Sequence, residues 1–195
     1  MTKGIPANAE PDRILNQENQ IIDEDHDVIR NVLDGDTNSY RRLVEKYQGP
    51  VFNLLIKMVN NFEDAEELTQ DVFVKAFESL AGFNFKYRFF SWIYKIAINR
   101  ALAELKYKTR YTEIEHVQNK LSEEDTDEPD SIAQVKMAIG NLKELYKAVI
   151  ILKYYEGLSY KEIAVVLDIP EKKVRSRLYD ARMKMKEALE KSGTR

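Results

Sequence analysis

The sequence contains no cysteine and only two histidines, His26 and His116, among its 195 residues. Without cysteine, the chain can form neither disulfide bonds nor a cysteine-ligated metal site. The two histidines stand apart in polar segments, and no glycine-rich phosphate loop is present. These absences argue against an enzyme and predict that no metal or cofactor is bound.

Long hydrophobic runs are also missing. Apolar residues make up 44% of the sequence, but no run approaches the roughly 20 residues that span a bilayer. The opening residues, MTKGIPANAEPDRILNQ, lack the apolar core of a signal peptide. With 32% charged residues, the composition is that of a globular protein, and the expected location is the cytoplasm.

Charge is abundant but unevenly distributed, which the net value of −3 conceals. Residues 1–36 hold nine acids and three bases, and residues 112–131 hold eight acids and one base. Residues 86–110, by contrast, hold seven bases and one acid, and residues 171–195 hold nine bases and four acids. Two basic blocks separated by an acidic one favour a nucleic-acid binder over an evenly mixed surface.

Apolar residues recur at helical spacing along most of the chain, and no segment alternates convincingly as a strand. The spacing therefore predicts an all-α fold. Residues 1–25 are polar and predict a flexible N-terminal extension, and the acidic, apolar-poor residues 112–131 predict a flexible linker. The expected organisation is two small helical domains, over residues 26–111 and 132–195.

Within the first domain, the pattern predicts a helix from about Ser39, a turn at Asn60-Asn61, and helices over 63–80 and 91–108. Gly49-Pro50 predicts a kink or a break in the first of these. In the second domain, a helical pattern over 132–155 can be interrupted near Gly140 and ends at Gly157, a residue that accepts a left-handed conformation.

The C-terminal part has the pattern of a helix-turn-helix. Ser159 and Glu162 form a capping box for a short helix, residues 168–170 supply a turn, and a longer basic helix is expected from 171 to about 191. Val174, Leu178 and Ala181 are expected to face inward. The side chains then left to reach DNA bases and phosphates are Lys172, Lys173, Arg175, Ser176, Tyr179, Asp180 and Arg182.

The alternative to a DNA-binding helix-turn-helix is a helical hairpin whose basic face contacts only solvent. Lys172 and Lys173 argue against it, because cations in the first turn oppose the helix dipole at a cost of about 0.3–1 kcal/mol each. That cost favours an anionic partner at this end of the helix.

A second candidate surface follows Gly82. Residues 83–92 contain six aromatic residues and two cations, a mixture that suits single-stranded DNA. Aromatic rings stack on unpaired bases at about 1–3 kcal/mol each, while cations hold the backbone. The alternative is that most of these aromatic residues belong to the hydrophobic core, and it applies to Phe83, Phe89, Trp92 and the nearby Tyr94. The residues that fit a core less easily are Asn84, Lys86, Tyr87 and Arg88.

Taken together, these segments resemble the extracytoplasmic-function (ECF) RNA polymerase sigma factors, over about residues 27–110 and 132–190. The similar motifs, in order, are Gly35-Asp36 with Ser39, Tyr40, Leu43 and Tyr47; DAEELTQDVF at 64–73; FFSWIYKIAIN at 89–99; YEGLSYKEIA at 155–164; Ile169-Pro170; and VRSRL at 174–178.

The resemblance implies a non-enzymatic protein that binds core RNA polymerase, through its β′ clamp and β subunit, and promoter DNA. An anti-sigma partner is the usual regulator. By resemblance, the polymerase-binding residues are Asp64, Glu67, Leu68, Gln70, Asp71 and Phe73. Those at the melted −10 element are Asn84, Phe85, Lys86, Tyr87, Arg88, Trp92, Lys95, Asn99 and Arg100. The outward residues of the last helix would read the −35 duplex.

The predicted linker is long enough to span the separation between the −10 and −35 promoter elements. Twenty residues extend at most roughly 65–70 Å, and elements some 16–17 base steps apart lie about 55 Å apart. Two departures from the family pattern leave the promoter sequence open. Asp180 stands where arginine is common, and Asn84-Phe85-Lys86 differs from the usual loop.

Two other functions remain as alternatives. A helix-turn-helix regulator that acts without polymerase would leave the acidic helix and the aromatic loop unexplained. A sigma-like interaction or decoy protein would share the fold without reading promoters.

Overall fold

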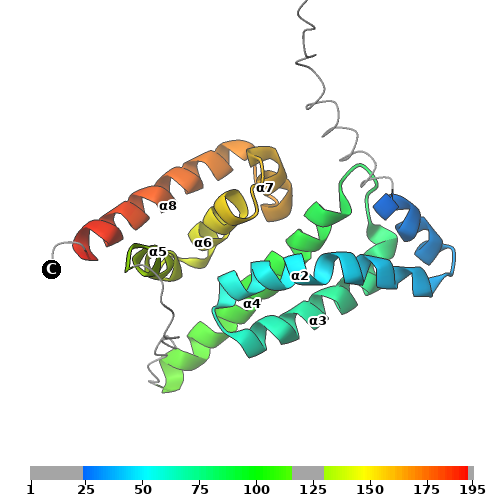
Figure 1. The fold of residues 1–195 in the computed structure, drawn as a ribbon, viewed down its shortest axis with the longest axis horizontal. Coiled ribbons are helices and arrows are strands. Elements are labelled where there is room, and N and C mark those ends of the chain that lie inside the picture. Colours follow the sequence, from blue (N-terminus) through cyan, green and yellow to red (C-terminus); the bar gives the residue numbers. More distant parts are fainter. Residues whose placement is uncertain (1–23, 116–129, 193–195) are drawn as a thin grey trace, which may run out of the picture.

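The structure is a computed structural model that describes residues 24–115 and 130–192. Most of the predicted N-terminal extension, His116 and residues 116–129 of the predicted linker lie outside these residues. Every regular element within them is helical, which confirms the all-α prediction. Figure 1 shows the helices of the N-terminal half gathered on one side and those of the C-terminal half on the other.

The N-terminal bundle consists of α2 (Tyr40–Val59), α3 (Phe62–Ser79) and α4 (Phe89–Glu115), which pack on one another. A helix over residues 24–33 adds three apolar side chains to the shared core. The short helical turns η1 (Thr37–Ser39) and η2 (Leu80–Gly82) complete this half. The predicted helix over 63–80 is thus confirmed to within a residue at each end.

Helix α2 passes through Gly49-Pro50 as one element, so the break that these residues could have caused does not occur. Tyr47, Val51 and Leu54 are buried on either side of the proline. Their burial stabilises the helical path although proline donates no hydrogen bond.

The turn at Asn60-Asn61 is confirmed. Asn60 ends α2 in the left-handed conformation, at φ 53°, which asparagine tolerates better than most residues. The Asn61 side chain then accepts a hydrogen bond from the Asp64 backbone and caps α3. Helix α4 is longer than predicted, because it continues to Glu115 rather than ending near Lys108.

The C-terminal half contains α5 (Asp130–Gly140), α6 (Glu144–Ile150), α7 (Tyr160–Leu167) and α8 (Glu171–Ser192). The interruption near Gly140 is confirmed. A π-helical turn, Ile151–Tyr155, extends α6, and its i+5 bond joins the Glu156 N–H to the Ile151 carbonyl at 3.1 Å. Gly157 ends the segment at φ 68°, as predicted.

The helix-turn-helix forms as the pattern indicates. Ser159 and Glu162 make both bonds of the capping box. Val174, Leu178 and Ala181 are buried and attach α8 to α6 and α7.

Replacing Ser159 with alanine is expected to lower the free energy of unfolding by about 1 kcal/mol, because the Glu162 N–H at the start of α7 loses its cap. Urea unfolding of the full chain measures the change. Ser176→Ala on the exposed face of α8 is the control, and we expect it to stay within about 0.5 kcal/mol. Equal effects of the two substitutions would show that the cap contributes nothing special.

Candidate nucleic-acid interface

Helix α8 presents its predicted DNA-binding residues to solvent. All seven are exposed, and Tyr179 is 61% exposed. Arg175 is held by an ion pair to Glu171 at 2.6 Å, and its guanidinium lies 5.3 Å from the centre of the Tyr160 ring. The hydrogen bond and charge of Glu171 raise the pKa of Arg175, so the side chain is a fixed cation at the head of the helix.

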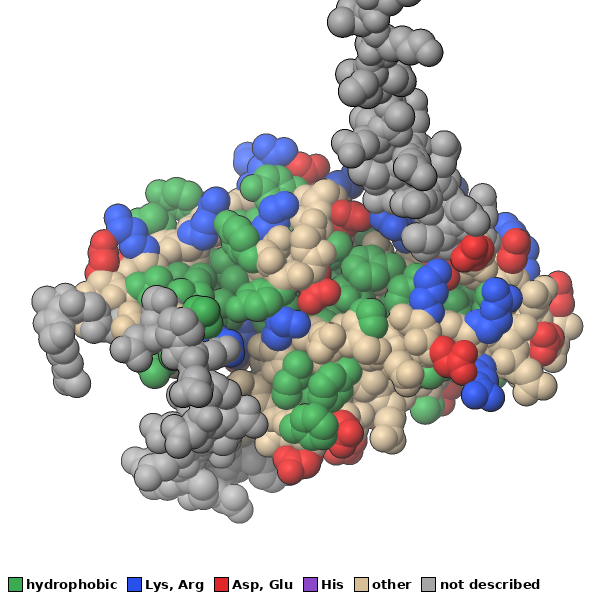
Figure 2. Space-filling view, in the orientation of Figure 1, with side chains coloured by type: hydrophobic (Ala, Val, Ile, Leu, Met, Phe, Trp, Pro, Cys, Tyr) green, Lys and Arg blue, Asp and Glu red, His purple; other side chains and the backbone are tan. Residues whose placement is uncertain are grey.

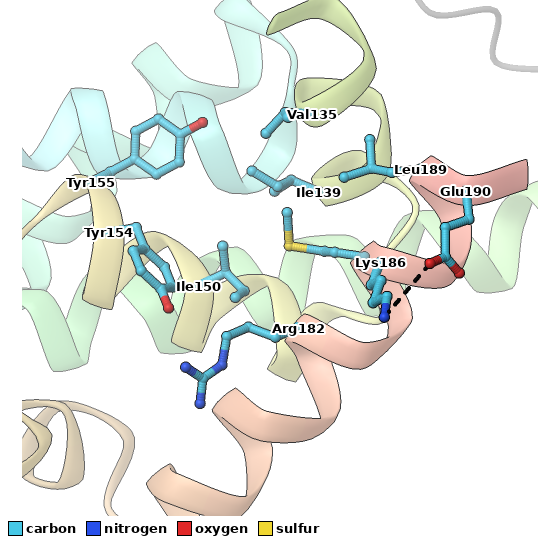
Figure 3. Close-up of a pocket in the computed structure, with 10 residues that line it drawn as sticks. Val135, Ile139, Ile150, Tyr154, Tyr155, Arg182, Lys186, Leu189 and Glu190 are labelled. Carbon is cyan, nitrogen blue, oxygen red and sulfur yellow. Dashed lines mark ion pairs between the residues drawn. The ribbon is translucent and has the colours of Figure 1, made fainter. Parts of the chain in front are cut away.

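An apolar groove lies in the same domain, between α5 and α8. Figure 2 shows hydrophobic side chains gathered there. The groove has a volume of about 710 Å³, and Figure 3 shows Arg182, Lys186 and Glu190 at its edge. Its apolar lining residues are Val135, Ile139, Ile150, Met185 and Leu189, together with the rings of Tyr154 and Tyr155. The sequence pattern did not predict an open groove at this place.

The aromatic-basic loop divides into a core part and an exposed part. Phe83, Phe89 and Tyr94 are buried, which settles them as core residues. Phe85 and Tyr87 are 37% and 48% exposed. The exposed side chains of the predicted set also include Asn84, Lys86, Asn99 and Arg100, and those partly buried are Arg88, Trp92 and Lys95.

The backbone of this loop is fixed by Asn84. Its carbonyl accepts a hydrogen bond from the Tyr87 N–H, and its side chain accepts one from the Lys86 N–H, both at 3.0 Å. Trp92 packs edge-to-face on Phe83, with ring centres 5.5 Å apart. The backbone that carries the Tyr87 side chain is therefore held in place by hydrogen bonds within the loop.

The helix over 24–33 packs against this loop, a contact that the sequence did not predict. The ring of His26 packs edge-to-face on both Phe83 and Phe85, and its Nε2 donates to the Tyr87 carbonyl at 3.1 Å. Arg30 lies over the Phe85 ring. The predicted extension ended at residue 25, whereas residues 24 and 25 are helical; the apolar spacing of Val28, Ile29 and Val32 was the available signal.

Buried polar groups anchor the start of this helix. Asp25 is buried and accepts hydrogen bonds from the Tyr47 hydroxyl and from Lys46, the latter at 2.6 Å. Burial, reinforced by the bond to Asp25, raises the pKa of Tyr47. The phenol therefore remains a neutral donor to the carboxylate.

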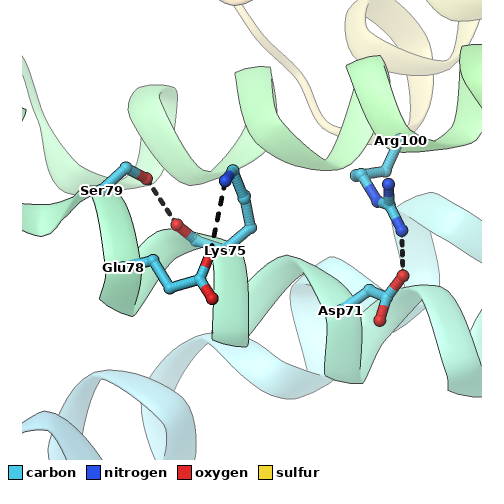
Figure 4. Close-up of polar contacts among 5 residues, drawn as sticks. All are labelled: Asp71, Lys75, Glu78, Ser79 and Arg100. Atoms are coloured by element: carbon cyan, nitrogen blue, oxygen red, sulfur yellow. Dashed lines mark hydrogen bonds and ion pairs between the residues drawn. The ribbon is translucent and has the colours of Figure 1, made fainter.

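The acidic helix α3 presents only part of its predicted polymerase-binding set. Asp71 pairs with Arg100 across to α4 (Figure 4), and Asp64 pairs with Lys108. Figure 4 also shows Lys75 paired with Glu78 one turn further along α3. Leu68 and Phe73 are buried and belong to the core of the domain, whereas Glu67 and Gln70 are exposed.

The two candidate DNA-binding regions also meet, which the sequence did not predict. Helix α4 packs against α7. Across this junction Lys95 pairs with Asp168 at 3.0 Å, Arg88 pairs with Glu162 at 3.5 Å, and the Tyr94 hydroxyl donates to Glu156 at 2.7 Å. A cavity of about 550 Å³ between them is lined by Asn84, Tyr87 and Trp92 on one side and by Ile169, Pro170 and Glu171 on the other.

The described residues contain no cluster of histidine, aspartate and glutamate side chains suited to a metal ion. Across the same part of the chain, none of the helices has the length and apolar character needed to cross a membrane. The geometry thus offers a basic helix, an aromatic-cationic loop and an acidic helix as its candidate surfaces.

Comparison with known protein families finds two matching regions. Sigma-70 region 2 matches residues 43–111, and Sigma-70, region 4, matches residues 132–185. The RNA polymerase sigma-H factor of Pseudomonas aeruginosa is 30% identical over 183 residues, which cover 86% of this chain and 95% of that protein. The ECF RNA polymerase sigma-E factor of Haemophilus influenzae is 33% identical over 173 residues, which cover 81% and 91%.

Solved structures share the fold. CnrH in complex with the cytosolic domain of CnrY has a TM-score of 0.63 at 22% identity, covering 84% of this chain and 95% of that one. The sigma factor RpoE from Bartonella quintana, in complex with the anti-sigma factor NepR, has a TM-score of 0.61 at 19% identity, covering 77% and 96%. With both sigma regions present in order and relatives matched over nine-tenths of their length, the chain belongs to the ECF RNA polymerase sigma factors, which direct promoter-specific initiation of transcription.

Proposed function

We propose that this chain binds core RNA polymerase and reads a promoter at two places, with α8 on the −35 duplex and the loop Asn84–Arg88 on the melted −10 strand. The observation that carries the proposal is the presence of two exposed surfaces of different chemistry. One is a basic helix in a helix-turn-helix, and the other is an ordered loop with exposed rings and cations.

Helix α8 suits a duplex because its exposed side chains form one face. The geometry of a helix-turn-helix places the start of the second helix in the major groove. Arginine can form a two-pronged bond to guanine, and lysines neutralise phosphates. Asp180 on the same face can accept from a cytosine amine, so the −35 sequence is expected to differ from those read by relatives with arginine there.

Arg175→Ala is expected to lower transcription from the preferred promoter by roughly 5- to 150-fold, the equivalent of about 1–3 kcal/mol for one lost base contact. Initiation assays on the preferred promoter and on one with a scrambled −35 element measure this, and the loss should vanish on the scrambled template. Arg177→Ala, two residues further along α8 and partly buried, is the matched control. A loss of the same size on both templates would argue against base reading by Arg175.

The loop suits a single strand because Tyr87 and Phe85 expose their rings while Lys86 stands exposed between them. An unstacked base can lie on such a ring, and the cation can hold the adjacent phosphate. Lys95, Asn99 and Arg100 extend this surface along α4. We call the −10 residues of the loop and of α4, from Asn84 to Arg100, the −10 surface.

Polymerase is proposed to contact the exposed face of α3, with Glu67 and Gln70 as the accessible residues of the predicted set. The domain limits proposed from the sequence are 26–111 for this half and 132–195 for the −35 half, with 112–131 as the linker. Helices extend beyond these limits, starting at residue 24, continuing to Glu115 in α4 and beginning again at Asp130 in α5. The chain itself makes and breaks no bond in this scheme, and it works in the cytoplasm, where polymerase and promoter DNA meet. An anti-sigma partner is proposed because the sigma factor RpoE from Bartonella quintana was solved in complex with the anti-sigma factor NepR.

The decisive test is transcription in vitro, with purified protein and bacterial core polymerase on a library of genomic promoter fragments. Transcript starts that share paired upstream elements would support the proposal and give both sequences. Polymerase binding without specific starts would favour a sigma-like decoy. Absence of polymerase binding, with duplex binding retained, would favour a helix-turn-helix regulator that acts alone.

A further inference from the structure

We infer that the acidic edge of the C-terminal domain, formed by Glu156, Glu162 and Asp168, is a docking surface for the −10 surface of the same chain. In the free protein it holds the two halves closed and occupies the cations that single-stranded DNA would need. The masking of DNA binding rests on the proposed function of the −10 surface; the docking itself does not.

The first support is charge complementarity at the loop and at α4. Arg88 and Lys95 are the two cations of the −10 surface that lie partly buried at the junction, and each faces a carboxylate from α7 or from the residue that ends it. A carboxylate accepts the same charge-assisted hydrogen bonds as a phosphate oxygen. Glu162 and Asp168 therefore occupy the side chains that would otherwise contact the DNA backbone.

The second support is a buried contact that a random collision of surfaces would not produce. The Tyr94 side chain has no exposed surface, and its hydroxyl donates to Glu156, whose side chain is only 13% exposed. The same carboxylate lies 3.9 Å from Lys57, and the Lys57 ammonium lies over the Tyr155 ring. Burial, followed by the hydrogen bond to Glu156, raises the pKa of Tyr94, so the donor stays neutral.

A third contact lies at the far end of the junction. Lys147 on α6 is 8% exposed, and its ammonium donates to the backbone carbonyl of Met58 at 3.5 Å. Burial lowers the pKa of Lys147. Thus α2, α4 and the −10 loop all contact the C-terminal domain, and the junction is an interface rather than one touching point.

The closed arrangement is incompatible with promoter reading. The −10 and −35 elements lie about 55 Å apart along the duplex, at ~3.4 Å per base step, whereas here Lys95 of the −10 surface contacts Asp168, three residues before α8 begins. The turn residues Ile169 and Pro170 face Tyr87 and Trp92 across the shared cavity. The acidic edge must leave the −10 surface before both elements can be bound.

Two substitutions test the docking while preserving the local structure. Glu156→Gln keeps an oxygen that can accept from Tyr94 but removes the charge. Asp168→Asn removes the charge at a residue with φ 53°, a conformation that asparagine tolerates. Glu162 is left in place because it also closes the capping box of α7. The control carries Glu187→Gln and Glu190→Gln near the C-terminal end of α8, with the same change in net charge.

The closure is measured as a distance between spin labels. Because the chain has no cysteine, Asn53→Cys on α2 and Met183→Cys on α8, both exposed, give two unique labelling sites. In the free protein we expect one short distance for the wild type and the control. The Glu156→Gln, Asp168→Asn protein is expected to add a longer, broader population. A wild type that is already broad, or a double variant that stays short, would overturn the docking.

The masking is measured with a fluorescently labelled 20-nucleotide oligothymidine in the same buffer. Because the apparent dissociation constant is the intrinsic one divided by the open fraction, opening is expected to tighten binding roughly three- to tenfold. The control should bind like the wild type. If the double variant opens but binds no tighter, docking stands and the proposed DNA-binding role of the −10 surface fails. If it binds tighter without opening, the docking proposal fails.

Discussion

Replacing Tyr87 with alanine is expected to slow promoter opening by roughly 5- to 150-fold, which corresponds to about 1–3 kcal/mol for the loss of one stacked base. Tyr87 is 48% exposed, and its backbone is held by Asn84 and His26, so the ring is presented to solvent without being part of the core. Permanganate reactivity of unpaired thymines, followed over time with the polymerase holoenzyme, measures the opening rate.

A template with a pre-melted −10 region separates base capture from general damage. At saturating holoenzyme, transcription by Tyr87→Ala should recover to near the wild-type rate on that template. Tyr107→Ala, an exposed tyrosine further along α4, is the control and should open the normal duplex as the wild type does. An undiminished defect on the pre-melted template would contradict a role in opening.

Reversing the charge of Glu67 to lysine is expected to weaken binding of core polymerase by roughly 30-fold or more, because a like charge placed against a complementary surface costs several kcal/mol. Glu67 is the strongest candidate on α3 since Asp64 and Asp71 already pair with cations of α4, and Leu68 and Phe73 are buried. Equilibrium titration of labelled protein with core polymerase gives the dissociation constant.

Glu45→Lys provides the matched comparison for Glu67. It makes the same charge change on α2, where the Glu45 side chain is 57% exposed. We expect it to leave the dissociation constant within about twofold. If both variants weaken binding alike, the effect is one of net charge, and α3 is not the contact surface.

Local periodicity predicted most of the helices and the exposed face of α8. Val174, Leu178 and Ala181 sit at a helical repeat, and burying such a repeat fixes which side chains face outward. The capping box and Gly157 marked helix ends for equally local reasons, since each satisfies hydrogen bonds within a few residues.

The junction between the halves had no such signal. It depends on single charged residues far apart in the sequence, such as Lys95 with Asp168. The sequence around an isolated charged residue does not show whether its side chain forms an ion pair or is solvated by water. Asp25 was assigned to the polar extension for a similar reason, because its polarity suggested exposure although hydrogen bonds from Tyr47 and Lys46 compensate for its burial. Leu68 and Phe73 belong to a family motif, but the motif does not indicate which of its side chains are exposed and which are buried.

The π-helical turn at Ile151–Tyr155 determines how the residues that follow α6 are rotated about the axis of that helix. An α-helix advances about 100° per residue, so one supernumerary residue rotates the downstream chain by about that angle relative to an uninterrupted helix. Deleting one residue from this turn would restore the α-helical repeat and swing Glu156 about 100° away from Tyr94. The helix-turn-helix would rotate with Glu156. The length of this five-residue turn therefore determines the orientation of α8 relative to the N-terminal half.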